Sequence, residues 1–248
     1  MTKVGVIGSA GKMGGLACGT VDATEGLSLV ARVDEGDPLS RLSEADTDVA
    51  VDFTHPGVVM DHVAWCFDHG IHIVVGTSGF TQERLDAIAD RLGDAPQVGV
   101  VVVPNFSIGA VLMMRFAALA APFFESVEIV ELHHPTKLDA PSGTSIRTAQ
   151  LIATARARAG SPPFPDATRD HELHARGVAV EGVSVHSVRA RGLVAHQEVL
   201  LGNLGETLTI RHDMPDRAAA MAGLVASVRY VVDHPGLTVG LEPILGLD

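Results

Sequence analysis

The chain has 248 residues, enough for one large domain or for two smaller ones that each have a core. Hydrophobic residues make up 46% of it and charged residues 19%, a composition that excludes an intrinsically disordered protein. The formal net charge of −12 argues against a nucleic-acid-binding protein, because an acidic surface repels phosphate backbones.

The first hundred residues alternate between short apolar runs and helical segments. Runs rich in valine and isoleucine predict strands over residues 3–7, 27–33, 48–53, 72–75 and 98–103. Helices are predicted between them, over residues 12–23, 58–69 and 81–92. Nearly continuous apolar strands indicate a parallel sheet that is covered on both faces. The alternation therefore predicts a Rossmann-like, doubly wound α/β domain.

The pattern changes after residue 105. Helices are predicted over residues 107–124, 142–159 and 216–233, and strands over residues 126–133, 183–189, 196–201 and 206–212. The last three strands follow one another with glycine turns and no helix between them, which predicts an α+β domain with a mixed sheet. We expect one domain over residues 1–105, rejoined by residues 215–248, and a second domain over residues 106–214.

A glycine-rich run, Gly8-Ser9-Ala10-Gly11-Lys12-Met13-Gly14, stands between the first predicted strand and the first helix. Glycines let the backbone approach a pyrophosphate, which the N-terminus of the following helix attracts. Asp34 ends the second strand, where a carboxylate can bind the adenosine ribose and repel the 2′-phosphate of NADP. We therefore expect NADH as the preferred cofactor, with NADPH possible. The alternative is an ordinary strand–helix turn with a solvated aspartate.

Three later loops also begin where predicted strands end. Phe53 follows the third strand, Gly76-Thr77-Ser78 the fourth, and Pro104-Asn105-Phe106 the fifth. Ligands of such sheets lie outside the carboxyl ends of the strands. This shared placement favours contacts with the ribose and nicotinamide of the cofactor over ordinary loop chemistry.

The run from Glu131 to Thr144, ELHHPTKLDAPSGT, carries the clearest chemistry. His133, His134 and Lys137 offer positive charge and proton donors at the end of a strand, as the reduction of an imine requires. Ser142-Gly143-Thr144 opens a helix, whose N-terminus can bind a substrate carboxylate. No third ligand at helpful spacing supports a metal site, and Ser142 lacks the GxSxG setting of a nucleophile.

With these motifs the chain resembles the 4-hydroxy-tetrahydrodipicolinate reductases, formerly called dihydrodipicolinate reductases. The resemblance rests on the E-x-H-H-x-x-K-x-D-x-P-S-G-T run, the GxxGxMG loop, and the D-F-T-x-P, G-T-[ST]-G-F and P-N-F-[SA]-x-G motifs. It extends through the late segments Ala195–Val199 and Gly205–Leu208 to Gly240–Pro243, and so covers essentially the whole chain. The acidic pair followed by Gly-Asp-Pro-Leu is similar to the actinobacterial branch.

The resemblance implies NAD(P)H-dependent reduction of 4-hydroxy-tetrahydrodipicolinate to tetrahydrodipicolinate in lysine and diaminopimelate biosynthesis. It implies a first domain that binds the dinucleotide, a second that binds substrate and builds a homotetramer, and no metal. His133 matches the general acid, and Lys137 matches the second proton donor and carboxylate partner. The implied substrate contacts are His134, Gly143 and Thr144. The implied cofactor contacts are Gly8, Ser9, Ala10, Gly11, Lys12, Met13, Asp34, Gly76, Thr77, Ser78, Val103, Pro104, Asn105 and Phe106.

Other functions remain to be weighed against this one. The same scaffold could reduce another carboxylated cyclic imine in a specialised pathway, or could sense the dinucleotide without catalysis, although a sensor needs neither proton donor. A covalent thiol mechanism is disfavoured, because Cys18 and Cys66 lie within predicted helices, away from the strand ends. The two cysteines form no CxxC pair, and no secretory signal or membrane span is evident, so we expect a cytoplasmic protein.

Overall fold

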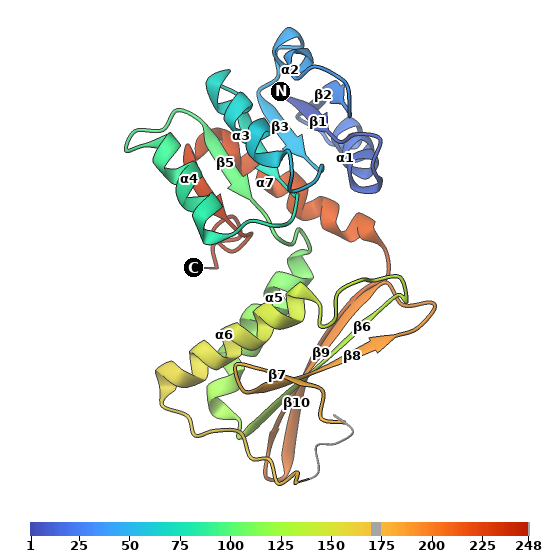
Figure 1. Cartoon of the computed structure of the whole chain (residues 1–248), viewed down its shortest axis with the longest axis vertical. Coiled ribbons are helices and arrows are strands. Elements are labelled where there is room, and N and C mark those ends of the chain that lie inside the picture. The colour runs from blue at the N-terminus through green and yellow to red at the C-terminus, as the bar shows by residue number, and fades with distance from the viewer. Residues whose placement is uncertain (170–174, 248) are drawn as a thin grey trace. The chain divides into compact units, whose positions relative to one another are not determined.

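The computed structural model describes residues 1–169 and 175–247, and divides the chain into two compact units (Figure 1). The first unit combines Met1–Ile108 with Arg217–Asp248, and the second comprises Gly109–Asp216. The expected domains, 1–105 with 215–248 and 106–214, have boundaries within a few residues of these. Residues 170–174 of the expected second domain lie outside the described residues.

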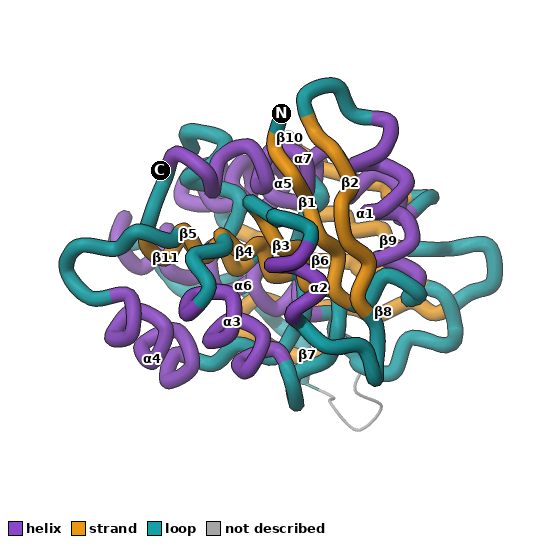
Figure 2. Tube along the Cα trace, turned by 90° about the horizontal axis from the view of Figure 1, so that it is seen from above, coloured by secondary structure: helices purple, strands orange, loops and turns teal. Residues whose placement is uncertain are grey.

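The first unit contains a six-stranded parallel sheet in the order β11-β5-β4-β3-β1-β2 (Figure 2). Its strands are β1 (Thr2–Ile7), β2 (Leu27–Val33), β3 (Val49–Asp52), β4 (His72–Val75), β5 (Gly99–Val102) and β11 (Gly236–Val239). Every residue of β3 and β5 is buried, as the continuous apolar runs predict. The order of the strands reverses between β1 and β3, the position where doubly wound sheets bind ligands.

Helices cover both faces of this sheet. They are α1 (Lys12–Ala23), α2 (Ser40–Glu44), α3 (Val59–Asp68), α4 (Gln82–Leu92) and α7 (Met221–Asp233). Figure 2 shows α3 and α4 on one side of the row of strands and α7 on the other. Val63 of α3 and Ile88 of α4 pack in one cluster with Ile73 and Val100 of the sheet. No helix among the described residues is long and apolar enough to cross a membrane.

The second unit has a five-stranded mixed sheet in the order β10-β9-β6-β8-β7, with helices packed on one face. Its elements are α5 (Ile108–Ala120), β6 (Ser126–His133), α6 (Gly143–Ala159), β7 (Val178–Val180), β8 (Val183–Arg189), β9 (Ala195–Asn203) and β10 (Glu206–Met214). Strand β6 runs parallel to β8 and antiparallel to β9. Ala117 of α5 and Ile152 of α6 pack on Ile129, Val185 and Val199 of the sheet. The α/β fold class with two different sheets is therefore confirmed.

Several elements differ from the predicted ones. The helix predicted over 107–124 ends as α-helix at Ala120 and continues as a 3-10 turn, Ala121–Phe123, because Pro122 cannot donate the next helical hydrogen bond. The helix predicted over 216–233 begins with a 3-10 turn, Arg217–Ala220, before α7. The sequence did not predict α2, β7 or β11, which have five, three and four residues and are too short for a clear periodicity.

Candidate active site

A tight turn between β1 and α1 brings backbone amides to the carboxyl edge of the first sheet. Gly8 has a φ of +83°, and a Cβ at this position would lie 2.7 Å from the carbonyl oxygen of Phe53. A Cβ on Gly14 would lie 2.0 Å from the carbonyl oxygen of Gly8, so α1 packs directly on the turn. The N-cap residue of α1 is Gly11, so no side chain there forms a capping hydrogen bond with the helix end. The first N–H groups of α1 therefore suit a phosphate.

The carboxylate of Asp34 lies against this glycine loop. Its Oδ2 accepts a hydrogen bond from the Ser9 hydroxyl at 2.5 Å, and its Oδ1 accepts one from the Ala10 N–H at 2.9 Å. The structure therefore brings the predicted acidic residue together with two of the predicted loop residues. Lys12, the predicted neighbouring cation, is exposed at the start of α1.

Asp52, at the end of β3, is fully buried and joins two of the predicted loops. Its Oδ1 accepts hydrogen bonds from the Thr54 N–H at 3.0 Å, the Thr54 hydroxyl at 2.8 Å and the Thr77 hydroxyl at 2.7 Å. Nδ1 of His62 lies 2.7 Å from its Oδ2. Burial alone would raise the pKa of Asp52, but these hydrogen bonds outweigh it and hold the pKa below its ordinary value.

Two aromatic rings meet over a glycine at the next loop. The Phe53 and Phe106 rings pack edge to face with centroids 5.6 Å apart. A Cβ on Gly76 would lie 2.2 Å from the Phe53 ring, so only glycine leaves room for the pair. Of the remaining predicted residues here, Thr77 and Val103 are buried, and Ser78 and Pro104 are exposed. The side chain of Asn105 accepts a hydrogen bond from the Ser107 N–H at 2.9 Å.

In the second unit, a buried carboxylate lies at the centre of the His-His-Lys segment. The Glu131 side chain is inaccessible to solvent, and its Oε2 lies 2.5 Å from Nδ1 of His133. Arg189 donates to both carboxylate oxygens, at 2.8 and 2.7 Å. The backbone N–H of Ser142 donates to Oε1 at 3.3 Å. One acidic side chain therefore links the ends of β6 and β8 to the start of α6.

The charges around His133 oppose one another. Burial is the largest influence and lowers the pKa of the imidazole, Glu131 partly offsets it, and the positive charges of Lys137 and Arg189 lower the pKa further. The net result is a pKa below the ordinary histidine value. The pKa of Glu131 is also lowered: burial would raise it, but hydrogen bonds from Arg189, Ser187 and His133 prevail. The carboxylate is therefore ionised at neutral pH.

The other predicted residues lie around the loop between β6 and α6. Nζ of Lys137 donates to Asp139 at 2.7 Å, and the Lys137 side chain is 20% exposed. Nδ1 of His134 lies 2.8 Å from the Thr136 hydroxyl. Ser142 is the N-cap of α6, and its hydroxyl oxygen accepts from the Ser145 N–H at 3.2 Å.

The first residue of α6 is open to a ligand. Gly143 is exposed, and a Cβ built on it would meet no atom within 4 Å. Because the first N–H groups of a helix have no acceptor within the helix, this end can receive a carboxylate. The structure thus places a cation, an imidazole and a helix N-terminus along one stretch of the second unit.

The predicted residues fall into two groups that the fold keeps on separate units. All predicted cofactor residues belong to the first unit, and His133, His134, Lys137, Ser142, Gly143 and Thr144 belong to the second. Within residues 1–169 and 175–247, no group of three or more potential ligand residues could hold a metal ion. Cys18 and Cys66 are both buried, and burial raises the pKa of the Cys66 thiol to about 12, which makes it a poor nucleophile.

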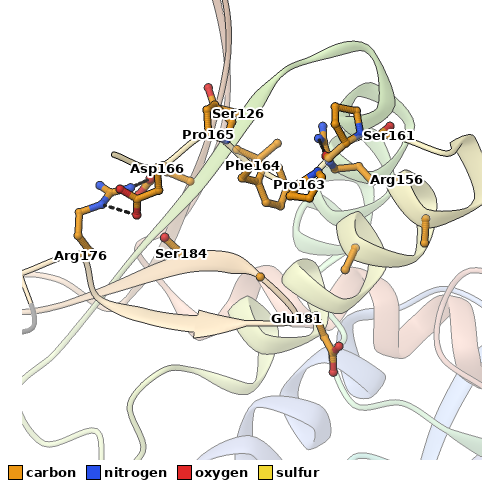
Figure 3. Close-up of a pocket in the computed structure, with 16 residues that line it drawn as sticks. Ser126, Arg156, Ser161, Pro163, Phe164, Pro165, Asp166, Arg176, Glu181 and Ser184 are labelled. Carbon is orange, nitrogen blue, oxygen red and sulfur yellow. Dashed lines mark hydrogen bonds and ion pairs between the residues drawn. The ribbon is translucent and has the colours of Figure 1, made fainter. Parts of the chain in front are cut away.

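A pocket of about 440 Å³ lies elsewhere in the second unit, between α6, the start of β6, the turn from β7 to β8 and the proline-rich loop after α6 (Figure 3). The Arg156 guanidinium lies over the Phe164 ring at 4.2 Å and donates to the carbonyl of Pro162 at 2.7 Å. Arg176 faces Asp166 at 3.6 Å. None of the residues that line this pocket is a predicted site residue.

Sequence reasoning assigned no role to three residues on which the site depends: Glu131, Arg189 and Asp52. Glu131 stands two residues before His133 on a strand, so both side chains share a face, a signal present in the sequence. An acidic residue inside an apolar strand, as Asp52 is, also signals a buried hydrogen-bonding role. Arg189 gave no local signal, because its partner is 58 residues away along the chain.

Comparison with known proteins gives one answer for both units. Residues 2–106 match the family model "Dihydrodipicolinate reductase, N-terminus", and residues 109–245 match "Dihydrodipicolinate reductase, C-terminus". The chain is 57% identical to the 4-hydroxy-tetrahydrodipicolinate reductase of Cutibacterium acnes, over 100% of both chains. It is 56% identical to that of Mycolicibacterium vanbaalenii, over 99% of both.

Solved structures support the same relationship. The dipicolinate-bound dihydrodipicolinate reductase of Paenisporosarcina superposes with a TM-score of 0.86 and 39% identity, covering 98% of this chain and 99% of that one. The scyllo-inositol dehydrogenase of Lactobacillus casei, at 12% identity and a TM-score of 0.61, shares the fold alone. The chain therefore belongs to the dihydrodipicolinate reductase family, whose members are NAD(P)H-dependent oxidoreductases.

Proposed function

We propose that this chain reduces 4-hydroxy-tetrahydrodipicolinate to tetrahydrodipicolinate with NAD(P)H, in lysine and diaminopimelate biosynthesis. The observation that carries the proposal is the segment from Glu131 to Thr144, where a buried ion pair, an imidazole, a lysine and an open helix N-terminus occur together. The full-length relationship to named 4-hydroxy-tetrahydrodipicolinate reductases supports the same substrate.

The first unit fits a dinucleotide. The turn at Gly8 and Gly14 excludes side chains where a backbone must lie close to a ligand, and α1 begins without a side-chain cap. Gly8 to Met13 would hold the pyrophosphate, Asp34 the ribose, and Phe53, Gly76 to Ser78 and Val103 to Phe106 the nicotinamide end. When bound, the cofactor supplies the hydride.

NADH is the preferred cofactor in this proposal. Asp34 is ionisable and followed by the exposed Glu35, and two such carboxylates repel a 2′-phosphate. Hydrogen bonds from Ser9 and Ala10 hold the Asp34 carboxylate beside the loop that would bind the pyrophosphate. In this position the carboxylate can accept hydrogen bonds from the ribose hydroxyls. Lys12 is the nearby cation that leaves NADPH usable.

His133 is the proposed general acid, and Lys137 assists it. His133 must carry a proton to donate one, and its lowered pKa makes the protonated form a stronger acid. Lys137 exchanges its contact with Asp139 for a substrate carboxylate and acts as second proton donor. The N–H groups of Gly143 and Thr144, with His134 and the Ser142 turn, would hold the other carboxylate.

The assembly proposed is a cytoplasmic homotetramer built through the second unit. Val188 and Leu200, each 38% exposed, lie on the face of the mixed sheet opposite α5 and α6, and would be covered by a second copy. The two free buried cysteines suit a reducing compartment. Sedimentation velocity should give a tetramer, and Val188→Asp with Leu200→Asp should lower the assembly state.

The deciding experiment follows NADH oxidation by its absorbance, with 4-hydroxy-tetrahydrodipicolinate generated enzymatically and NADPH run in parallel. Rapid oxidation establishes the reaction, and a higher kcat/KM with NADH establishes the preference. If the protein binds NADH but does not oxidise it in the presence of this substrate, the proposed reaction is wrong. Other carboxylated cyclic imines would then be tested as substrates.

A further inference from the structure

The Glu131 carboxylate contacts several groups of the candidate site, and it also accepts a hydrogen bond from Ser187 on β8. Oε2 faces Nδ1 of His133 and one guanidinium nitrogen of Arg189, while Oε1 faces the other guanidinium nitrogen and the Ser142 N–H. The bidentate contact fixes the carboxylate in one orientation. A further hydrogen bond of the guanidinium, to the carbonyl of Asp139 at 2.9 Å, ties the pair to the loop that carries Lys137.

This arrangement determines which nitrogen of His133 exchanges a proton. An ionised carboxylate only accepts hydrogen bonds, so Nδ1 of His133 must carry the hydrogen that faces Glu131. Nε2 is then bare in the neutral imidazole and is the atom that gains a proton in the charged form. A carboxylate that holds a histidine tautomer in this way raises the proton affinity of the ring.

We propose that Glu131 and Arg189 are positioning residues that set the tautomer and the proton affinity of His133, as a charge-balanced triad. The proposal rests on the proposed function, in which His133 is the general acid. Glu131 alone would hold the imidazole protonated too firmly to act as an acid at neutral pH. Burial opposes that effect most, and the positive charges of Lys137 and Arg189 add to the opposition, so Glu131 can fix the ring without holding its proton too firmly.

Four charged groups bear on His133, and their signs predict the outcome of removing each. Glu131 lies on its own strand, Arg189 on β8, and Lys137 and Asp139 in the following loop. The neighbouring turn of α6 contributes uncharged Ser142 and Ser145. Glu131→Gln removes the negative charge in contact with the imidazole and should lower the pKa of His133. Arg189→Met removes a cation that opposes Glu131 and should raise the pKa of His133. Shifts of the His133 pKa in opposite directions in the two variants would show that Glu131 and Arg189 act on the imidazole with opposing charges.

The same strand provides a matched control. Glu128 also accepts from a histidine and an arginine, His186 at 2.5 Å and Arg176. It alternates with Glu131 along β6 and therefore lies on the other face of the sheet. Glu128→Gln removes an equivalent Glu–His–Arg contact without approaching His133. It should leave the tautomer and the titration of His133 unchanged.

The test is a histidine ¹⁵N titration of the full-length protein by NMR, with His133→Gln assigning the signal among the 12 histidines. The wild-type protein should show the tautomer with hydrogen on Nδ1. In Glu131→Gln, His133 should no longer show a single tautomer and should titrate at lower pH than in the wild type. In Arg189→Met, His133 should titrate at higher pH. If Arg189→Met does not fold, the double variant Glu131→Gln with Arg189→Met, which buries no unpaired charge, should restore a near-wild-type titration.

Kinetics add an independent measurement. Since general acid catalysis contributes about 10² to 10⁴ in rate, Glu131→Gln should lose about tenfold or more in kcat, with the Kd for NADH unchanged within about twofold. A shift in the same direction for both single variants, or an unchanged tautomer in Glu131→Gln, would overturn the proposal. Full activity of His133→Gln would instead overturn the acid role, while the NMR result still decides whether the triad sets the imidazole.

Discussion

Replacing Asp52 with alanine should destabilise the first unit strongly. The side chain is fully buried and accepts hydrogen bonds from His62, Thr54 and Thr77, and Thr77 is itself only 6% exposed. Hydrogen bonds to charged groups are worth about 1.5–3 kcal/mol each, and the buried Thr77 hydroxyl would lose its acceptor. Allowing for relaxation, we expect the free energy of unfolding to fall by about 4 kcal/mol.

The loss should depend on pH in a defined direction. The folded-state pKa of Asp52 is lowered, so its contribution is fully present above the ordinary value of 3.8 and disappears as the pH falls through the folded-state value. The difference between wild type and Asp52→Ala should therefore be largest at neutral pH and shrink in acid. Urea unfolding at a series of pH values measures it.

Asp68→Ala is the control for this prediction, because Asp68 forms an exposed contact with Arg91 in the same unit. Exposed pairs contribute little, so its unfolding curve should match the wild type. Asp52→Ala should also speed amide hydrogen exchange at Thr54 and Thr77 and weaken NADH binding. A loss below about 1 kcal/mol with wild-type exchange in both loops would refute the idea that one carboxylate organises them.

Three further substitutions test the proposed roles directly. His133→Gln should lower kcat about 10²- to 10⁴-fold while NADH binding stays intact; parallel losses in both would contradict an acid role. Lys137→Ala should lower kcat and raise the KM for the substrate, and wild-type kinetics would remove Lys137 from the mechanism. Asp34→Ala should weaken NADH and narrow its advantage over NADPH in kcat/KM, whereas an unchanged ratio would show that Asp34 does not read the ribose.

The sequence predicted the first sheet well because its signals are local. A run such as Val100–Val102 has no polar residue to place outside, so it must be covered on both faces. The signal for the glycine turn is equally local, since the spacing of its glycines predicts that α1 begins close to the end of β1. The short edge strand β11 could not be predicted, because Gly236 begins it and only pairing with β5 gives it strand geometry.

The candidate site was predicted in part for the same reason. His133 and Lys137 lie within one short motif, and their chemistry is readable without a fold. Arg189 reaches the site through the parallel pairing of β6 with β8, in which His133 lies opposite Arg189 itself. Such pairing between distant segments is set by the sheet as a whole, and no periodicity in either strand specifies it.

The return of the chain to the first unit has a consequence for how the protein forms during synthesis. The second unit is continuous, from Gly109 to Asp216, and can fold as soon as that stretch has left the ribosome. The first unit cannot be finished then, because β11 and the buried face of α7, with Leu224, Val228 and Val231, are made last. Until they arrive, β5 is an open edge, where premature termination would leave a chain prone to aggregation.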